Sequence, residues 1–153
     1  MEALGWRLFA HRLFQQQLEG LTSRVERLAK QEPARFPSHP SVKMLATIRR
    51  LILEVIPRDP GAPEFRLGST LGPDNRHWFR AKFHQRYRLF FRFSTQHRII
   101  IYAWVNDETS LRKAGSKSDT YAQFKLMLER GELPASFDDL MRVCKPTGRG
   151  SQP

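Results

Sequence analysis

The sequence predicts an α+β fold, in which an antiparallel meander sheet packs on an N-terminal helical hairpin and a further helix lies near the C-terminus. Two patterns support this prediction. Apolar residues recur every three or four positions in two early segments, as on one face of a helix. Three later segments are rich in β-branched and aromatic residues and are separated by short polar turns. With 153 residues, we expect one domain at 1–145 and a disordered tail at 146–153.

The first part of the chain predicts a short strand and two helices. Residues 5–10, GWRLFA, form the strand. In the first helix the apolar positions from Phe14 to Leu28 are spaced by four, three, four and three residues, and PARFPSHP ends the helix with three prolines. The second helix begins near Ser41, repeats the spacing and stops at Pro57. Because the connection is short, we expect the two helices to lie antiparallel.

The second part predicts the sheet and the C-terminal helices. Residues 77–83 and 87–93 read as strands joined by the short connection HQR. The segment at 98–105, RIIIYAWV, follows a polar turn and completes an antiparallel meander. A helix at 119–130 and a shorter amphipathic segment at 136–143 come last.

Charge is the most informative total. The 26 Lys and Arg residues against 15 Asp and Glu leave a net charge of +11. The excess is concentrated, since residues 76–130 hold 12 basic and 4 acidic side chains and residues 1–75 hold 11 and 8. A polyanion is the expected partner, with nucleic acid as the default. A membrane surface is a weaker candidate, because the cations lie on strand-like sequence.

Several other classes of protein lack support. No apolar run approaches the roughly 20 residues that span a bilayer, and the basic start is not followed by an apolar signal core. A single cysteine, Cys144, excludes an internal disulfide framework. The five histidines lack metal-site spacing, and GSTLG does not fit a phosphate-binding loop. We therefore expect a cytoplasmic protein that needs no metal or cofactor.

Strand alternation places the cations on one face of the predicted sheet, because successive side chains of a strand point to opposite faces. That face collects Trp78, Arg80, Lys82, Arg88, Phe90, Arg92, Arg98, Ile100, Tyr102 and Trp104. The opposite face is apolar and is expected to pack on the helical hairpin. Its residues are Phe79, Ala81, Phe83, Tyr87, Leu89, Phe91, Phe93, Ile99, Ile101, Ala103 and Val105.

An open face of cations and aromatics is typical of single-stranded nucleic-acid binding, since cations attract phosphates and rings stack on bases. The alternative is a solvated face that only keeps the protein soluble, but solvation does not require aromatics among the cations. The RNA-binding candidates are Trp78, Arg92, Tyr102, Trp104, Arg112 and Lys113.

A second cationic element precedes the helix at 119–130. In LRKAGSKSDTYAQF, three cations come before the helix start, at Arg112, Lys113 and Lys117. A helix start offers free N–H groups and partial positive charge, which together favour an anion. Tyr121 lies in the first turn, and by its spacing alone it fits the core stripe of that helix.

These residues resemble a known family. The run WFRAKFHQRYRLFFRF, followed by IIIYAWVNDETSLRKAGSKSDTYAQF, is similar to the YhaV toxins of bacterial toxin–antitoxin pairs and, more distantly, to the RelE superfamily. The closer resemblance extends from GWRLFAH to about residue 142. It implies a RelE-like fold and an mRNA-cleaving toxin that stops translation until an antitoxin neutralises it.

The resemblance also implies the site. RelE-like toxins carry a basic pair two residues apart on one strand and an arginine after tyrosine on the next, and near the final helix they carry a basic residue and a tyrosine. The matching residues here are Arg80, Lys82, Arg88, Lys117 and Tyr121. Arg112 competes with Lys117 for its role.

The expected reaction is metal-independent cleavage of single-stranded RNA, in which the 2′-hydroxyl attacks the adjacent phosphorus and leaves a 2′,3′-cyclic phosphate. Arg80, Arg88 and Lys117 would stabilise the charge that develops on the phosphate. Lys82 is the candidate general base, and Tyr121 would either orient the 2′-hydroxyl or stack on a base.

The implied partners are mRNA, either free or on the ribosome, and a PrlF-like antitoxin whose swapped-hairpin domain binds operator DNA, so that the complex represses its own operon. Two other classes of function stay open at this point. One is a basic RNA-binding module that blocks translation without cutting RNA. The other is a structural subunit whose basic face docks an acidic partner.

Overall fold

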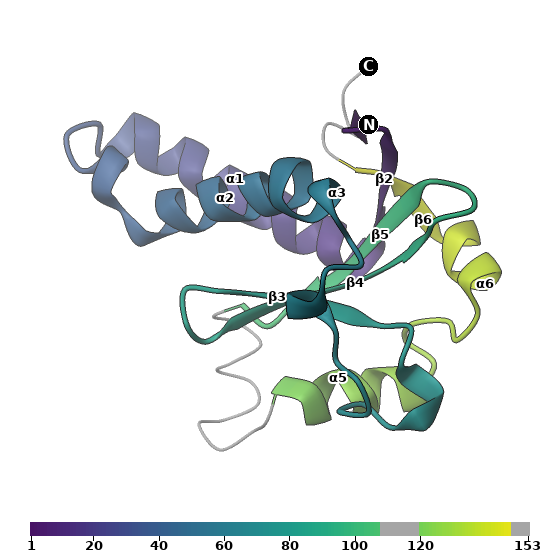
Figure 1. Ribbon diagram of the computed structural model, residues 1–153. Coiled ribbons are helices and arrows are strands. Elements are labelled where there is room, and N and C mark those ends of the chain that lie inside the picture. The colour runs from purple at the N-terminus through teal and green to yellow at the C-terminus, as the bar shows by residue number, and fades with distance from the viewer. Residues whose placement is uncertain (108–119, 148–153) are drawn as a thin grey trace.

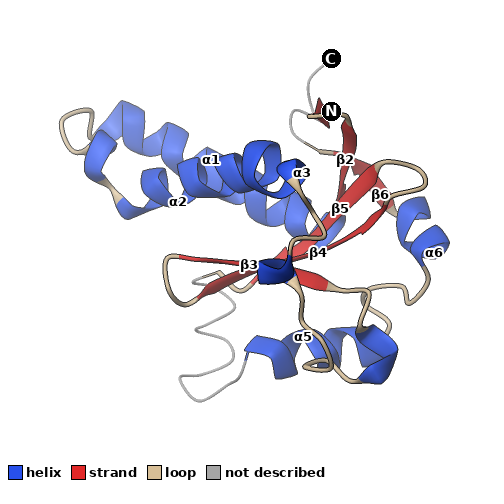
Figure 2. Cartoon of the chain, in the orientation of Figure 1, coloured by secondary structure: helices blue, strands red, loops and turns tan. Residues whose placement is uncertain are grey.

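A mixed sheet runs through the centre of the molecule, with helices on both of its faces (Figures 1 and 2). The computed structural model describes residues 1–107 and 120–147. The sheet is six-stranded, in the order β1-β2-β5-β4-β3, with β6 paired to β2. The strands are β1 (Glu2–Ala3), β2 (Trp6–His11), β3 (Phe79–Phe83), β4 (Tyr87–Ser94), β5 (Ile99–Val105) and β6 (Cys144–Pro146).

The helices are divided between the two faces. On one face α1 and α2 lie side by side, and on the other α5 crosses below the sheet (Figure 1). The α-helices are α1 (Arg12–Gln31), α2 (Pro40–Arg50), α3 (Ile56–Arg58), α5 (Thr120–Glu129) and α6 (Phe137–Arg142). Shorter turns are η1 (Phe36–Ser38), the π-helical η2 (Leu51–Val55), η3 (Pro63–Phe65) and η4 (Pro73–Asn75). None of the helices in the described ranges is long and apolar enough to cross a bilayer.

The predicted meander is confirmed. β3 pairs with β4, and β4 pairs with β5, both antiparallel. The strand predicted at 5–10 is β2, which joins this meander by pairing in parallel with β5, so the sheet as a whole is mixed. The boundary predicted for the disordered tail, at residue 146, lies too early in the chain. Pro146 belongs to β6 and pairs with Phe9 of β2. Thr147 is buried, and its N–H donates to Leu8 O at 2.9 Å. Residues 148–153 lie outside the described residues.

The buried side chain of His11 caps the start of α1. The Nδ1 atom of His11 accepts a hydrogen bond from Leu13 N–H at 3.2 Å, which satisfies one of the free donors of the helix start. Burial, helped by the neighbouring Arg12 charge, lowers the pKa of His11 to about 4. The imidazole therefore stays neutral and can accept the bond at neutral pH.

The second helix continues further than predicted. It passes through a π-helical turn, in which Ile56 N–H bonds to Leu51 O, and reaches Arg58, so that Pro57 lies inside its last turn. Since proline has no N–H, it cannot serve the carbonyl of Ile52 five residues before it. The hydroxyl of Tyr102 in β5 supplies that bond at 2.8 Å. The helix thus ends one residue beyond Pro57, and the hydroxyl of Tyr102 replaces the donor that the proline lacks.

Strand alternation was right for two strands and wrong for part of the third. On β3 and β4 the predicted apolar residues pack toward α1 and α2. On β5, however, Ile100 and Tyr102 face those helices, whereas Ile99 and Ile101 face α5 and α6. Every residue of β5 is buried, so its sequence carries no polar face to set the alternation.

A β-bulge changes the register within β5. Pairing passes from Phe90–Trp104 to Phe91–Tyr102, which leaves Ala103 as the extra residue. Trp104 consequently lies on the same side of the sheet as Ala103. Val105 returns to the α1–α2 side, where it was expected.

A glutamine side chain closes the open edge of β5. The parallel partner β2 pairs with β5 only as far as Tyr102, so the strand beyond that point has no neighbour on this side. Gln17 on α1 takes the place of a strand. Its Nε2 donates to Val105 O at 2.6 Å, and Val105 N–H donates to its Oε1 at 3.0 Å.

We expect the Gln17→Ala substitution to lower the free energy of unfolding by about 1–3 kcal/mol, because both backbone groups of buried Val105 lose their partner. Chemical denaturation measures the change. The matched control is Gln16→Ala, one position away on an exposed part of the same helix. Equal stability of the two variants would show that the amide does not close the strand edge.

We expect Tyr102→Phe to cost about 1–3 kcal/mol of stability, since it leaves the carbonyl of Ile52 unpaired inside the core without changing the shape of the ring. Thermal unfolding monitored by circular dichroism provides the measurement. A variant as stable as the wild type would contradict the account of how Pro57 is tolerated within the helix.

Candidate functional site

Two arginines from neighbouring strands converge on one tyrosine. Arg80 Nε on β3 donates to the phenol oxygen of Tyr121 at 3.0 Å, and Arg88 Nε on β4 donates to the same oxygen at 3.3 Å. Tyr121 lies in the first turn of α5. The structure therefore brings together three of the five residues predicted to be catalytic, and we call them the Arg80–Arg88–Tyr121 cluster.

Backbone carbonyls hold the guanidinium of Arg80 in place. Its Nη1 donates to Glu64 O at 3.0 Å and to Arg66 O at 3.3 Å. Both carbonyls belong to the segment around η3, which Arg66 joins to the sheet through a bridge with Phe79. The remaining nitrogen, Nη2, has no hydrogen-bond partner within residues 1–107 and 120–147.

The β3–β4 hairpin holds Arg88. Its Nη1 donates to Gln85 O at 2.8 Å and to Tyr87 O at 2.9 Å. The hairpin reaches this form because His84 and Gln85 both adopt positive φ, at 46° and 67°. Residues other than glycine and asparagine rarely adopt positive φ angles, so the backbone of this turn is strained next to the cluster.

The two arginines make the phenol of Tyr121 more acidic. Partial burial by itself raises the pKa of this group. The hydrogen bonds from Arg80 and Arg88, together with their positive charges, outweigh burial, and the pKa of Tyr121 falls below its ordinary value. The cluster thus favours the phenolate, a potential proton acceptor, between two cations.

The other predicted cations are Lys82 and the three basic residues that precede α5 in the sequence. Lys82 is exposed on β3, two residues from Arg80, and pairs across the sheet with Arg88. Its position therefore fits the rim of the cluster. Lys117, Arg112 and Lys113 lie outside the described residues, and their expected roles stay predictions.

Asn106 is a residue of this site that the sequence analysis missed. Fully buried just after β5, it accepts a hydrogen bond from Arg88 N–H at 2.6 Å through Oδ1. Its Nδ2 donates to Arg86 O at 2.9 Å and to Thr120 Oγ1 at 2.8 Å. The motif WVNDE contains Asn106, but a polar residue after an apolar strand reads as an ordinary loop residue.

The expected open surface of aromatic rings is not formed by the described residues. Trp78 and Tyr102 are 0% exposed and Trp104 is 7% exposed, so none of them offers a ring face to a base. On this side of the sheet α5 and α6 form a second core, in which Phe90 stacks on Phe124 with ring centroids 4.1 Å apart. The expectation was wrong because strand alternation alone does not show which face the later helices cover.

Arg92 also has a structural position instead of the predicted RNA contact. The residue is only 8% exposed. Its guanidinium carbon lies 5.4 Å from the ring centroids of both Trp78 and Phe137. Its Nη1 donates a hydrogen bond to Ala135 O at 3.0 Å. Burial lowers its pKa to about 10, so it remains a cation at neutral pH. Arg92 joins the sheet to the segment that leads into α6.

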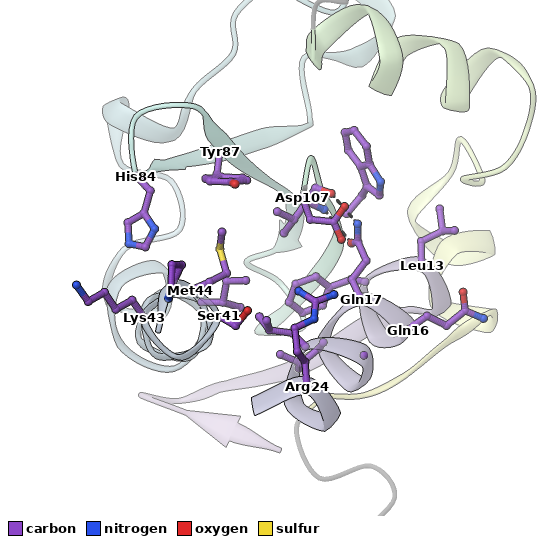
Figure 3. A pocket seen from close by; sticks show the side chains of 18 of the residues that line it. Leu13, Gln16, Gln17, Arg24, Ser41, Lys43, Met44, His84, Tyr87 and Asp107 are labelled. Atoms are coloured by element: carbon purple, nitrogen blue, oxygen red, sulfur yellow. Dashed lines mark hydrogen bonds between the residues drawn. The ribbon is translucent and has the colours of Figure 1, made fainter. Parts of the chain in front are cut away.

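A groove of about 710 Å³ lies beside α1 and α2 at the ends of β4 and β5, and its lining extends to Met127 of α5 (Figure 3). Gln17, Met44 and Tyr87 are among its lining residues, and its rim carries charges of both signs at Arg24 and Asp107. None of the cluster side chains lines it. The groove is large enough to hold a ligand, but the convergent cations and the perturbed phenol lie elsewhere.

No metal centre is evident in the part of the chain that the structure describes, where no group of three or more His, Cys, Asp and Glu side chains is arranged to hold a metal ion. The single thiol, Cys144, is half-buried, and burial raises its pKa to about 12. It is therefore a protonated, unreactive group at neutral pH.

Comparison with known proteins gives a consistent family. Residues 8–145 match the YhaV toxin family, described as a toxin with endonuclease activity, of toxin-antitoxin system. The chain is 41% identical over 145 residues to the ribonuclease toxin YhaV of Escherichia coli K12, which covers 94% of both proteins. It is 42% identical over 138 residues to the toxin YhaV of Escherichia coli O6:H1, covering 89% of this chain and 90% of the relative. No solved structure matches.

The cluster predicts an unusual tyrosine titration. We expect Tyr121 to ionise at lower pH than Tyr102, whose pKa burial raises well above its ordinary value. Near-ultraviolet absorbance against pH reports this step, which Tyr121→Phe should remove and Arg88→Ala should move upward. A first ionisation that is unchanged in Arg88→Ala would mean that Arg88 does not stabilise the phenolate.

Proposed function

This chain belongs to the YhaV family of toxins with endonuclease activity, and we propose that it stops translation by cutting mRNA at the Arg80–Arg88–Tyr121 cluster. The observation that carries the assignment is the convergence of two guanidinium groups on one phenol oxygen, at 3.0 and 3.3 Å. The cluster supplies in one place the cations that RNA phosphate requires and a group able to accept a proton.

The arginines stabilise the transition state. As the 2′-oxygen bonds to phosphorus, negative charge grows on the non-bridging phosphate oxygens. Guanidinium groups suit these oxygens for two reasons. Their planar set of N–H donors matches the geometry of a phosphate, and the group is always positively charged. Carbonyls and the phenol hold Arg80 and Arg88 before substrate arrives, so little reorganisation is needed during the reaction.

Proton transfer completes the reaction without a metal. The 2′-hydroxyl gives its proton to the oxygen of Tyr121, in the phenolate form that the hydrogen bonds from Arg80 and Arg88 favour, as the O2′–P bond forms. The P–O5′ bond then breaks, and the ammonium group of Lys82 donates a proton to the departing 5′-oxygen. The products are a 2′,3′-cyclic phosphate and a 5′-hydroxyl. The sequence-based assignment of Lys82 as the base is the alternative to this division of roles, and we prefer Tyr121 because its oxygen accepts hydrogen bonds from both arginines.

The arrangement of elements further supports a RelE-like fold. The strand β2, the helices α1 and α2, the antiparallel meander β3–β5 and then the helix α5 follow one another in the order expected of that superfamily. Two of its expected cationic positions, Arg80 and Arg88, meet at the cluster.

Regulation follows from the charge of the site. A toxin of this family has an antitoxin partner, which we propose carries a PrlF-like swapped-hairpin DNA-binding domain and represses the shared operon together with the toxin. The protein would act in the cytoplasm, on mRNA that is free or bound to the ribosome. A net charge of +11 makes an acidic antitoxin segment the natural inhibitor, because it would neutralise the same cations that bind RNA.

The direct test is cleavage of a defined mRNA in EDTA, with and without ribosomes. We expect wild-type protein to leave cyclic-phosphate ends and Arg88→Ala to cut about a hundredfold more slowly or worse. Arg27→Ala, which removes an exposed arginine from α1, is the matched control for lost charge and should cut normally. Undiminished cleavage by a folded Arg88→Ala protein would refute the site. Intact RNA in every lane with salt-sensitive binding would indicate a non-catalytic RNA-binding module.

A further inference from the structure

We propose that Asn106 is the positioning residue of this site, and that its buried side-chain amide sets the placement of Arg88 relative to Tyr121. The inference rests on the proposed function for its effect on RNA cleavage, but its geometric content can be measured without RNA. It assigns a role to a residue that has no contact with the reacting atoms.

Asn106 first fixes the backbone of Arg88. The regular pairing of β4 with β5 ends at Leu89–Val105, one residue short of Arg88. Asn106 extends it, since its Oδ1 accepts from Arg88 N–H at 2.6 Å and its own N–H approaches Arg88 O at 3.4 Å. One residue therefore binds both backbone groups of Arg88, at the point where strand pairing would otherwise stop.

The same amide also fixes the start of α5. Nδ2 donates to the hydroxyl of Thr120 at 2.8 Å, and Thr120 is the first residue of the helix and the neighbour of Tyr121. The second Nδ2 hydrogen is used by Arg86 O at 2.9 Å. A single planar group thus joins three elements: the β3–β4 hairpin, the first residues of β4 and the helix that carries the phenol.

Only an amide satisfies all of these partners. The position needs one acceptor, for Arg88 N–H, and two donors, for Arg86 O and Thr120 Oγ1. Asparagine offers this combination, whereas aspartate has no donor and leucine has neither donor nor acceptor. Because Asn106 is fully buried, water cannot replace a lost partner.

The consequence for function is geometric. The phenol oxygen of Tyr121 accepts from guanidinium groups on two strands, so a small displacement of α5 lengthens both hydrogen bonds at once. Catalytic groups lose much of their effect when they move by about 1 Å. The link between Asn106 and Thr120 opposes that displacement from behind the cluster.

The test uses two substitutions that break the link, one conservative rescue and one matched control, all on the full-length protein. Asn106→Ala removes the whole link but can prevent folding. Thr120→Val is milder, since it removes only the hydroxyl that accepts from Nδ2 and keeps the branched shape of the side chain. Thr120→Ser keeps the hydroxyl and serves as the conservative rescue. Thr95→Val makes the same chemical change at an exposed turn residue and is the matched control.

Two readouts separate positioning from simple stability. For Thr120→Val we expect kcat for RNA cleavage to fall about tenfold or more, with KM nearly unchanged, because substrate binding is retained while the reacting groups are misplaced. The pKa of Tyr121, followed by near-ultraviolet absorbance, should rise toward its ordinary value as the arginine hydrogen bonds weaken. Thr120→Ser and Thr95→Val should behave as wild type in both measurements.

The outcomes distinguish the two proposals. A Thr120→Val protein that is less stable but keeps the wild-type titration and kcat would overturn the positioning role and leave Asn106 as a structural residue. A titration that shifts while kcat stays unchanged would uphold the positioning role, and would contradict instead the proposed use of Tyr121 in cleavage.

Discussion

The hydrogen bonds from Arg80 and Arg88 to one phenol oxygen are the interaction on which the account of this protein depends. Two guanidinium groups this close repel each other, and the arrangement requires oxygen atoms to offset that repulsion. Tyr121 supplies one, and backbone carbonyls of the η3 segment and of the β3–β4 hairpin supply the others. The strained hairpin and the buried amide of Asn106 are best understood as the support of this contact.

The oxygen atoms that accept hydrogen bonds from Arg80 and Arg88 are carbonyl and phenol oxygens, and this matters for the charge of the site. In the part of the chain that the structure describes, Arg80 and Arg88 bond to carbonyls and a phenol and form no ion pair with a carboxylate. Carbonyl oxygens orient a guanidinium without neutralising it. The site therefore keeps its positive charge for an incoming phosphate, and the large excess of Lys and Arg over residues 76–130 adds to the attraction.

The sequence predicted this site unevenly, for physical reasons. Alternation on β3 and β4 is clear because the cations of each strand stand an even number of residues apart, and it correctly placed Arg80 and Arg88 on one side of the sheet. It failed on β5, where both faces are buried between helix layers, so Tyr102 was assigned to the wrong face. Tyr121 became a site candidate only through family resemblance, because its spacing also fits a core stripe. No local pattern marks Asn106, whose partners come from distant segments.

The most direct test of the central claim is a double-mutant cycle on the rate of RNA cleavage, with Arg88→Ala, Tyr121→Phe and the combined variant. If the arginine acts by holding and ionising the phenol, the two residues work as one unit, and the double variant should be scarcely slower than the more damaged single variant. If the losses of the single variants multiply in the double variant, the two groups act independently. The cluster would then not be the catalytic unit described above.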